Sequence, residues 1–266
     1  MGHATLQIVK RILQSCNISF NTDSVFCNSC AISKIHQLPF TTSHTVYTHP
    51  LELIFVDIWG PAQVCSVNGD RYYISFVDAF SRFTWVYMLH SKSQSFDIFI
   101  NFKTMIEKQL GFSIKAIQTD NAREFIHFDK FLAKFGIIHH YTCPYSHPQN
   151  GTVERKHIHI VETGLSFLAH ASMPLKYWDF AFKAATLVIN NLPTSVLQYK
   201  TPHEILYHHP PKYELFRVFD CTCFPLLRPY NKHKFDFKSH ACLFLGYSVN
   251  KKGYLCLHPN DNFVLQ

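Results

Sequence analysis

The chain has 266 residues, of which 47% are hydrophobic and 25 are phenylalanine, so it can bury a sizeable core and is not a disordered protein. Its formal net charge of +7 and its 18 histidines favour an anionic partner. The sequence has no apolar run of about 18 residues and no secretory signal, and its nine scattered cysteines are typical of reduced thiols, so we expect a nuclear or cytoplasmic protein without a membrane partner.

The N-terminal part of the chain predicts a helix followed by a pair of cysteines. Apolar residues recur at helical spacing over residues 4–15, and a polar turn leads to Cys27 and Cys30. The stretch that follows is polar, is interrupted by proline and shows no periodicity, which is typical of a linker. We therefore expect a small N-terminal segment over residues 1–36 and a linker over residues 37–48.

Alternating strand-like and helical patterns predict one larger α/β domain over residues 49–210. Its first three strand-like runs are separated by turn residues, which favours an antiparallel meander. The order is three strands, a helix, a strand, a helix and a strand. This order is typical of a ribonuclease-H-like fold, with a mixed five-stranded sheet flanked by helices. The predicted strands are 51–58, 71–79, 82–89, 112–119 and 137–141, and the predicted helices are 92–110, 127–135, 152–170 and 174–192.

Past about residue 210 the composition changes to short apolar runs that are separated by basic, proline-containing turns. This pattern predicts a small β-rich module over residues 211–266. The apolar runs lie at 215–219, 241–247 and 253–257.

Three carboxylates stand at positions that call for a functional explanation. Asp57 lies inside an apolar strand-like run, Asp120 ends a second one, and Glu154 opens a long helical stretch. A charged side chain in an apolar strand costs free energy unless it is paired or binds a metal ion. Each residue also has a plainer interpretation, because an aspartate at a strand end is often a turn residue and Glu154 can complement a helix dipole. Asp78, in another strand-like run, is an alternative to Asp57 as the buried acid.

Convergent carboxylates suit phosphoryl transfer. Two divalent cations about 4 Å apart can stabilise negative charge on both the attacking and the leaving oxygen. Mg²⁺ takes oxygen ligands and keeps several waters, so a few carboxylates are enough to hold it. Carboxylates that are brought together raise one another's pKa until a cation neutralises them. Two strand carboxylates and one on the first turn of a neighbouring helix would meet this need.

Three long motifs surround these carboxylates. They are Phe55-Val56-Asp57-Ile58-Trp59-Gly60-Pro61, Thr119-Asp120-Asn121-Ala122-Arg123-Glu124-Phe125 and Cys143-Pro144-Tyr145-Ser146-His147-Pro148-Gln149-Asn150-Gly151-Thr152-Val153-Glu154-Arg155-Lys156. In this order they closely resemble the integrase region of Ty1/copia-type LTR retrotransposon Pol polyproteins, and the resemblance covers almost the whole chain. It implies a metal-dependent polynucleotidyl transferase that trims the 3′ ends of element DNA and joins them to target DNA. Asp57, Asp120 and Glu154 would be its catalytic residues and would bind two Mg²⁺ or Mn²⁺ ions.

The resemblance implies double-stranded DNA as the partner, both as element ends and as target, and a homo-oligomer as the active form. Gln149 and Asn150, on the loop before the third carboxylate, would contact the DNA end. Arg155 and Lys156 would hold phosphates beside Glu154. Both basic residues also have an ordinary interpretation as solvated helix charges.

The chain departs from the family pattern at three positions near these carboxylates. Glu154 is two residues closer to Asp120 than is usual in the family. Ala122 stands where the family has glycine, and it would be strained if the backbone there needed a positive φ. His157 stands where the family often has asparagine.

The N-terminal segment matches only part of the family's His-His-Cys-Cys zinc module. His3 corresponds to the second histidine, and Cys27 and Cys30 correspond to the two thiolates. The first histidine would lie upstream of the first residue, so the Zn²⁺ site is incomplete unless Cys16 or His36 supplies a fourth ligand. We therefore expect the chain to be a fragment of a polyprotein.

Two alternatives to an active integrase stay open at this point. One is a catalytically inactive relic or co-opted DNA-binding module, which keeps the fold and the basic surface and binds DNA in a salt-sensitive way. The other is a ribonuclease-H-like nuclease. The loop that contains Gln149 and Asn150 favours integrase over the nuclease.

Overall fold

The structure is a computed structural model, and it describes residues 3–19, 28–34, 45–142, 151–226, 233, 235, 237–248, 253–258 and 263–265. The chain forms two compact units, Met1–Thr45 and Val46–Gln266. In the part of the chain that is described, no helix is both long enough and apolar enough to cross a lipid bilayer.

The first unit contains two helices, α1 (Leu6–Ser15) and α2 (Asn28–Ser33). The helix predicted over residues 4–15 is confirmed. α1 buries none of its side chains, and apolar residues such as Leu6 and Ile12 stay exposed. Burial of an apolar face is the main source of helix stability in proteins, so α1 gains little from packing.

The second unit is built on a mixed sheet of five strands in the order β3-β2-β1-β4-β5. β1, β2 and β3 form the predicted antiparallel meander, whereas β4 runs parallel to β1 and β5 runs parallel to β4. This arrangement confirms the predicted ribonuclease-H-like order. The strands are β1 (Ile54–Trp59), β2 (Tyr72–Asp78), β3 (Thr84–Leu89), β4 (Ala116–Thr119) and β5 (Ile138–Tyr141).

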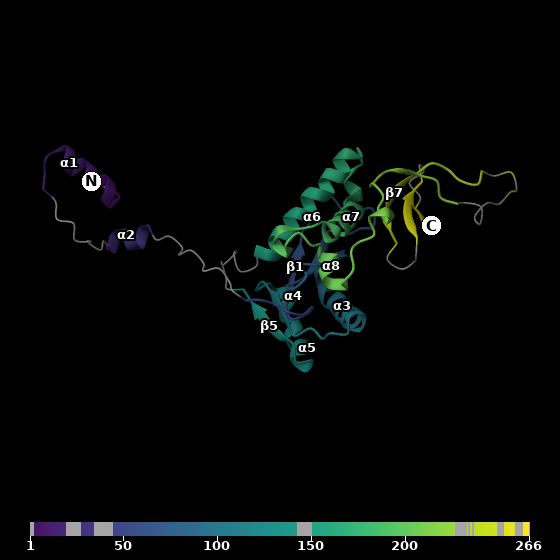
Figure 1. Cartoon of the computed structure of the whole chain (residues 1–266), viewed down its shortest axis with the longest axis horizontal. Coiled ribbons are helices and arrows are strands. Elements are labelled where there is room, and N and C mark those ends of the chain that lie inside the picture. Colours follow the sequence, from purple (N-terminus) through teal and green to yellow (C-terminus); the bar gives the residue numbers. More distant parts are fainter. Residues whose placement is uncertain are drawn as a thin grey trace. The chain divides into compact units, whose positions relative to one another are not determined.

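Helices follow the strands in the predicted order (Figure 1). Gly111 ends α3 with a φ of 73°, a conformation that glycine adopts without strain. Thr201 caps α8, because its hydroxyl accepts a hydrogen bond from the Glu204 N–H at 2.9 Å. The helices are α3 (Ser95–Leu110), α4 (Arg123–Ile126), α5 (Phe128–Lys134), α6 (Gly151–His170), α7 (Trp178–Asn191) and α8 (Pro202–Tyr207), with 3₁₀ turns η1 (Lys92–Gln94), η3 (Leu175–Tyr177), η4 (Ser195–Leu197) and η5 (Tyr213–Leu215).

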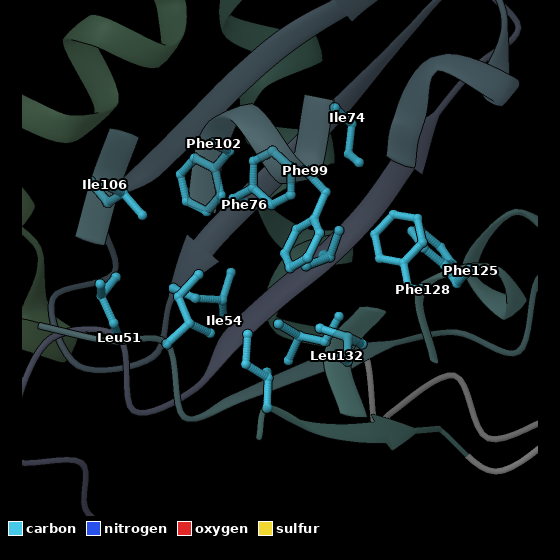
Figure 2. Close-up of a cluster of buried hydrophobic side chains, with 14 of the residues drawn as sticks. Leu51, Ile54, Ile74, Phe76, Phe99, Phe102, Ile106, Phe125, Phe128 and Leu132 are labelled. Atoms are coloured by element: carbon cyan, nitrogen blue, oxygen red, sulfur yellow. The ribbon is translucent and has the colours of Figure 1, made fainter. Parts of the chain in front are cut away.

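Side chains of β1 alternate between two apolar layers. Ile54 and Val56 belong to a buried cluster that α3, α4 and α5 complete. Figure 2 shows this cluster, in which Phe76 of β2 stacks on Phe102 of α3 with ring centroids 4.1 Å apart. The intervening residues of β1 face the other layer, and Asp57 is one of them.

α6 and α7 cover this opposite face of the sheet. Trp59 and Tyr73, on neighbouring strands, stack with ring centroids 5.2 Å apart, and both contact the ring of Phe182 on α7. Gly164 lets α6 approach α7 closely, because a Cβ at this position would overlap the Phe182 ring. This packing holds α6, and with it Glu154, over the sheet.

The strand predicted over residues 112–119 begins later than expected, at Ala116. The N–H of Ile114 donates to the Glu107 carboxylate at 2.8 Å and not to a neighbouring strand. Residues 112–114 therefore connect α3 to β4, and backbone hydrogen bonds to the neighbouring segments begin at Lys115.

The helix predicted over residues 127–135 is confirmed as α5, and a short helix that was not predicted, α4, ends directly before His127. Phe125 precedes His127 and Phe128 follows it, and both side chains are buried with ring centroids 5.4 Å apart. The change of direction therefore lets both rings enter the same apolar cluster.

The predicted β-rich C-terminal module contains a four-stranded sheet in the order β6-β7-β8-β9. The apolar run 215–219 forms no strand, so that part of the prediction is wrong. The run begins at the last residue of η5, and of its five side chains only Phe219 is buried in the layer that α6 and α7 cover. The strands are β6 (Thr222–Cys223), β7 (Cys242–Tyr247), β8 (Tyr254–Leu257) and β9 (Phe263–Leu265).

Candidate active site

Asp57 lies on the face of β1 that α6 covers, and its side chain is 19% exposed. One carboxylate oxygen, Oδ1, accepts a hydrogen bond from the Ile58 N–H at 2.8 Å. The other, Oδ2, lies 3.4 Å from Nε2 of His157. Asp57 is therefore a half-buried carboxylate that no lysine or arginine neutralises in the described residues, and this leaves it able to bind a cation.

Asp120 follows directly after β4, beside Asp57. The parallel register pairs Ile54 with Ile117, so three residues further along each strand Asp57 and Asp120 come side by side. Burial, together with the negative charge of Asp57, raises the pKa of Asp120. The charge of Asp57 therefore acts on Asp120, in addition to burial.

Ala122 does not strain the turn that follows Asp120. Its φ is −74°, so this backbone position does not need glycine. The N–H of Ala122 donates to Oδ1 of Asp120 at 3.2 Å, which fixes the carboxylate at the end of β4. The departure from the family's usual glycine therefore has no conformational cost here.

Glu154 lies in the first turn of α6. It lines a cavity of about 480 Å³ together with Asp57, the end of β1 and His157. Asp57 thus has one predicted carboxylate on each side: Asp120 lies next to it, and Glu154 lines the same cavity. The structure brings the three predicted carboxylates to the same end of the sheet.

The oxygen ligands that this site offers are of the kind that hard divalent cations bind. All three are carboxylates, the ligands that Mg²⁺ and Mn²⁺ take. Burial first, and the negative charge of Asp57 second, raise the pKa of Asp120, and a bound cation would favour its ionised form. Among the described residues, no three histidine, cysteine, aspartate or glutamate side chains already stand close enough together to hold a metal ion. Residues 143–150, directly before α6, lie outside the described residues.

Asp78, the alternative buried acid, has a structural role. Its side chain is fully buried and accepts hydrogen bonds from the Leu51 N–H and from both the N–H and the hydroxyl of Ser81. Burial raises the pKa of Asp78, and these three donors oppose the rise. Asp78 therefore organises the turn between β2 and β3.

Two of the four predicted DNA contacts can be placed. Arg155 is exposed, whereas Lys156 is half-buried. Burial, aided by the positive charge of Arg82, lowers the pKa of Lys156 to about 8. Gln149 and Asn150 lie outside the described residues. A desolvated ammonium beside a second cation is an unfavourable arrangement that an anion would relieve.

In the N-terminal unit, His3 and Cys30 come together, with Nδ1 3.5 Å from Sγ. Cys27 and His36 lie outside the described residues, so the predicted Zn²⁺ ligand set cannot be assembled from the described part of the chain. Six cysteines in the described ranges carry free thiols, namely Cys16, Cys65, Cys221, Cys223, Cys242 and Cys256.

A hydrogen-bonded group of side chains supports β4 directly before Asp120. Nε2 of His139 lies 2.9 Å from the Thr119 hydroxyl, and Nδ1 lies 2.7 Å from the Asp129 carboxylate. The Tyr141 hydroxyl donates to the same carboxylate at 2.8 Å. Burial lowers the pKa of His139, and the contact with Asp129 opposes this only in part. His139 is therefore neutral in the folded protein at pH 7.

We expect the free energy of unfolding to fall as the pH drops below about 6.5, the ordinary histidine pKa. The unfolded chain takes up the His139 proton first, because the folded pKa is lower, so folding loses stability until the pH passes the folded pKa. One such group gives a slope of at most about 1.4 kcal/mol per pH unit. Denaturant unfolding of the wild type and of His139→Gln at a series of pH values measures this slope. If the unfolding free energy of the variant fell as steeply with pH, His139 would not be its cause.

Sequence comparisons agree with the residue patterns. Residues 47–147 match the integrase core domain family, and residues 221–265 match the retroviral polymerase SH3-like domain family. The chain is 42% identical over 261 residues to the retrovirus-related Pol polyprotein from transposon RE2 of Arabidopsis thaliana, a match that covers 97% of the chain and 18% of that protein. It is 30% identical over 270 residues to the corresponding polyprotein from transposon TNT 1-94 of Nicotiana tabacum, covering 100% of the chain and 20% of that protein. The chain thus spans about a fifth of the length of these relatives.

A solved structure shares the fold. The chain is similar to one in the cryo-electron-microscopy structure of a simian T-cell lymphotropic virus intasome in complex with the PP2A regulatory subunit B56 gamma. The TM-score is 0.54 at 18% sequence identity, and the match covers 99% of this chain and 89% of that chain.

Proposed function

Because the chain belongs to the integrase core family and corresponds to the integrase region of Ty1/copia-type Pol polyproteins, we propose that it is a polynucleotidyl transferase that processes element DNA ends and joins them to target DNA. The observation that carries this proposal is the position of Asp57. It lies beside Asp120 across the parallel β1–β4 pair and lines one cavity with Glu154. In this proposal the three carboxylates bind Mg²⁺ or Mn²⁺.

Each carboxylate enters the site from an element that the fold holds in place. β1 and β4 are central strands of the sheet, and α6 is packed against α7. When bound, two divalent cations would stabilise charge on the attacking and leaving oxygens of the phosphodiester. Asp57 would supply a ligand from β1, Asp120 one from the turn directly after β4, and Glu154 one from the first turn of α6. Because these elements hold the carboxylates in place, the site would need little rearrangement when negative charge develops on the phosphodiester oxygens.

DNA phosphates are the proposed anionic partner of the adjacent basic residues. Lys156 and Arg155 follow Glu154 on α6, and the lowered pKa of Lys156 reflects a site where positive charge is buried without full compensation. A phosphate placed there would restore the favourable charge balance and position the backbone near the carboxylates. We further propose that the active form is a homo-oligomer on paired DNA ends, in the nucleus or cytoplasm.

The test is a joining reaction on a branched DNA substrate that resembles an integration product, with the full chain and either Mg²⁺ or Mn²⁺. We expect a cation-dependent reaction in which the 3′-hydroxyl of the target strand attacks the phosphodiester at the branch, which rejoins the target strand and releases the branch strand with a free 3′-hydroxyl. Glu154→Gln should reduce this activity to background, whereas the matched variant Glu162→Gln, two turns further along α6 and exposed, should keep it. Salt-sensitive DNA binding with no joining by the wild type would instead favour the inactive DNA-binding module.

A further inference from the structure

His157 contacts Asp57 from α6 and is buried. Its Nε2 lies 3.4 Å from Oδ2 of Asp57 and 3.4 Å from the hydroxyl oxygen of Ser75. Its Nδ1 lies 2.7 Å from the hydroxyl oxygen of Tyr73. Both ring nitrogens therefore have polar neighbours. One of these neighbours is a carboxylate oxygen of Asp57, a proposed cation ligand.

The chemistry of these groups sets the direction of each hydrogen bond. Nε2 lies at the same distance from the Asp57 carboxylate and the Ser75 hydroxyl. An ionised carboxylate can only accept, so the contact with Asp57 is attractive only when Nε2 carries a hydrogen. In the neutral imidazole Nδ1 is then an acceptor, and the Tyr73 hydroxyl must donate to it. Burial and the negative charge of Asp57 raise the pKa of Tyr73, so this phenol keeps its proton. Tyr73 thereby selects the tautomer of His157 that presents an N–H to Asp57.

Packing fixes this group of side chains in space. Asp57 and Ser75 are directly opposite in the β1–β2 register, so both project from the same face of the sheet. The Tyr73 ring stacks on Trp59 and meets the Phe182 ring edge-on, and these two rings also contact each other. Tyr73 is fully buried, so close packing restricts movement of its hydroxyl away from Nδ1.

The contact with His157 completes the support of the Asp57 carboxylate. The Ile58 N–H already holds Oδ1 at 2.8 Å, and His157 approaches Oδ2. A hydrogen bond to one oxygen and a 3.4 Å contact with the other restrict the orientation of the carboxylate, while its remaining lone pairs stay available to a cation. Outer groups of this kind orient metal ligands and tune their affinity.

We infer that His157, held in one tautomer by Tyr73, is a positioning residue that orients Asp57 for divalent-cation binding. The inference rests on the proposed function, because it concerns the same cation site. It adds two residues from outside the carboxylate set, one on α6 and one on β2, and it gives the histidine at this position a role distinct from filling the core.

The experiment measures Mn²⁺ binding to the full chain by electron paramagnetic resonance at constant pH. His157→Leu should weaken Mn²⁺ binding by about 10- to 100-fold, the usual effect of losing an outer-shell partner. His157→Gln places an amide N–H near the position of Nε2 and should restore most of the affinity. Tyr73→Phe should weaken binding, whereas Tyr87→Phe, a matched change on β3 facing the other layer, should not. Thermal unfolding of each variant checks that it folds.

The outcomes separate the two proposals. Mn²⁺ binding by the wild type that His157→Leu and Tyr73→Phe leave unchanged or strengthen would overturn the positioning role and leave the proposed function standing. Equal weakening in the leucine and glutamine variants would overturn it as well, because the N–H would then not be the relevant group. A wild type that binds no Mn²⁺, or whose binding survives Asp57→Asn, would overturn both proposals.

Discussion

Asp120→Asn is expected to remove cation-dependent DNA joining and, at the same time, to stabilise the cation-free protein. The loss of activity should reach about 1,000-fold, since a cation supplies several kcal/mol of charge stabilisation in phosphoryl transfer and each 1.4 kcal/mol is about tenfold in rate. The gain in stability follows from the raised pKa of Asp120. Burial and the charge of Asp57 disfavour the ionised form in the folded protein, and asparagine has no charge to bury.

Thermal unfolding in the presence of a chelator measures the second effect. We expect the midpoint of Asp120→Asn to rise by about 2–4 °C, which corresponds to about 1 kcal/mol in a chain of this size. Adding Mn²⁺ should then raise the midpoint of the wild type more than that of the variant, because the ligand stabilises only the state that binds it.

Asp97→Asn is the matched control, since Asp97 is exposed in the first turn of α3 and outside the site. It should leave joining unchanged and should not stabilise the protein, because an aspartate in the first turn interacts favourably with the helix dipole. A fall in the midpoint of Asp120→Asn would contradict the electrostatic account of the site.

The sequence was sufficient to predict the sheet and the face of it on which Asp57 lies, and the reason is periodicity. Alternation along β1 separates Ile54 and Val56 from Asp57, so a single strand already assigns the acid to a different face from the main apolar cluster. The runs that became β1, β2 and β3 carry their own turn residues, which makes a meander a local property of the sequence. The match to family motifs then joined segments that are far apart in the chain.

Contacts between distant residues could not be predicted in the same way. The sequence gives no local reason to prefer Asp57 over Asp78, because the difference lies in the three donors that the chain folds around Asp78. His157 stood out only as an unusual residue three positions after Glu154. Its partner Tyr73 is 84 residues away and meets it only when α6 packs on the sheet.

The predicted strand boundaries were wrong where side-chain contacts took the place of hydrogen bonds to a neighbouring strand. The late start of β4 depends on the Glu107 carboxylate, which takes the Ile114 N–H that a longer strand would have used. The apolar run 215–219 resembles a strand in composition, yet the structure uses it to send Phe219 into an existing layer. In both cases tertiary contacts overrode a local preference, as is common for β-propensity.

Phe76→Ala is expected to cost about 3–5 kcal/mol of unfolding free energy, the usual range for removing a buried aromatic ring. Phe76 lies on β2, between β1 and β3, and its side chain is fully buried. Its ring stacks on Phe102 at 4.1 Å and meets the edge of Tyr87 at 5.8 Å. Alanine would leave a void lined by rigid rings, which cannot collapse to fill it. Urea unfolding measures the loss. The control is Phe235→Ala, which should change the unfolding free energy by less than about 0.5 kcal/mol because Phe235 is fully exposed.

The same variant tests whether the two faces of the sheet act independently. Phe76 points into the layer under α3, while its neighbour Ser75 points to the opposite face, toward His157 and Asp57. Folded Phe76→Ala should therefore bind Mn²⁺ about as tightly as the wild type, although it unfolds at lower urea concentration. A large loss of Mn²⁺ affinity in the fully folded variant would mean that packing under α3 also fixes the cation site. Stability and cation binding would then depend on one shared set of contacts through β2, and not on the two separate faces that the strand alternation implies.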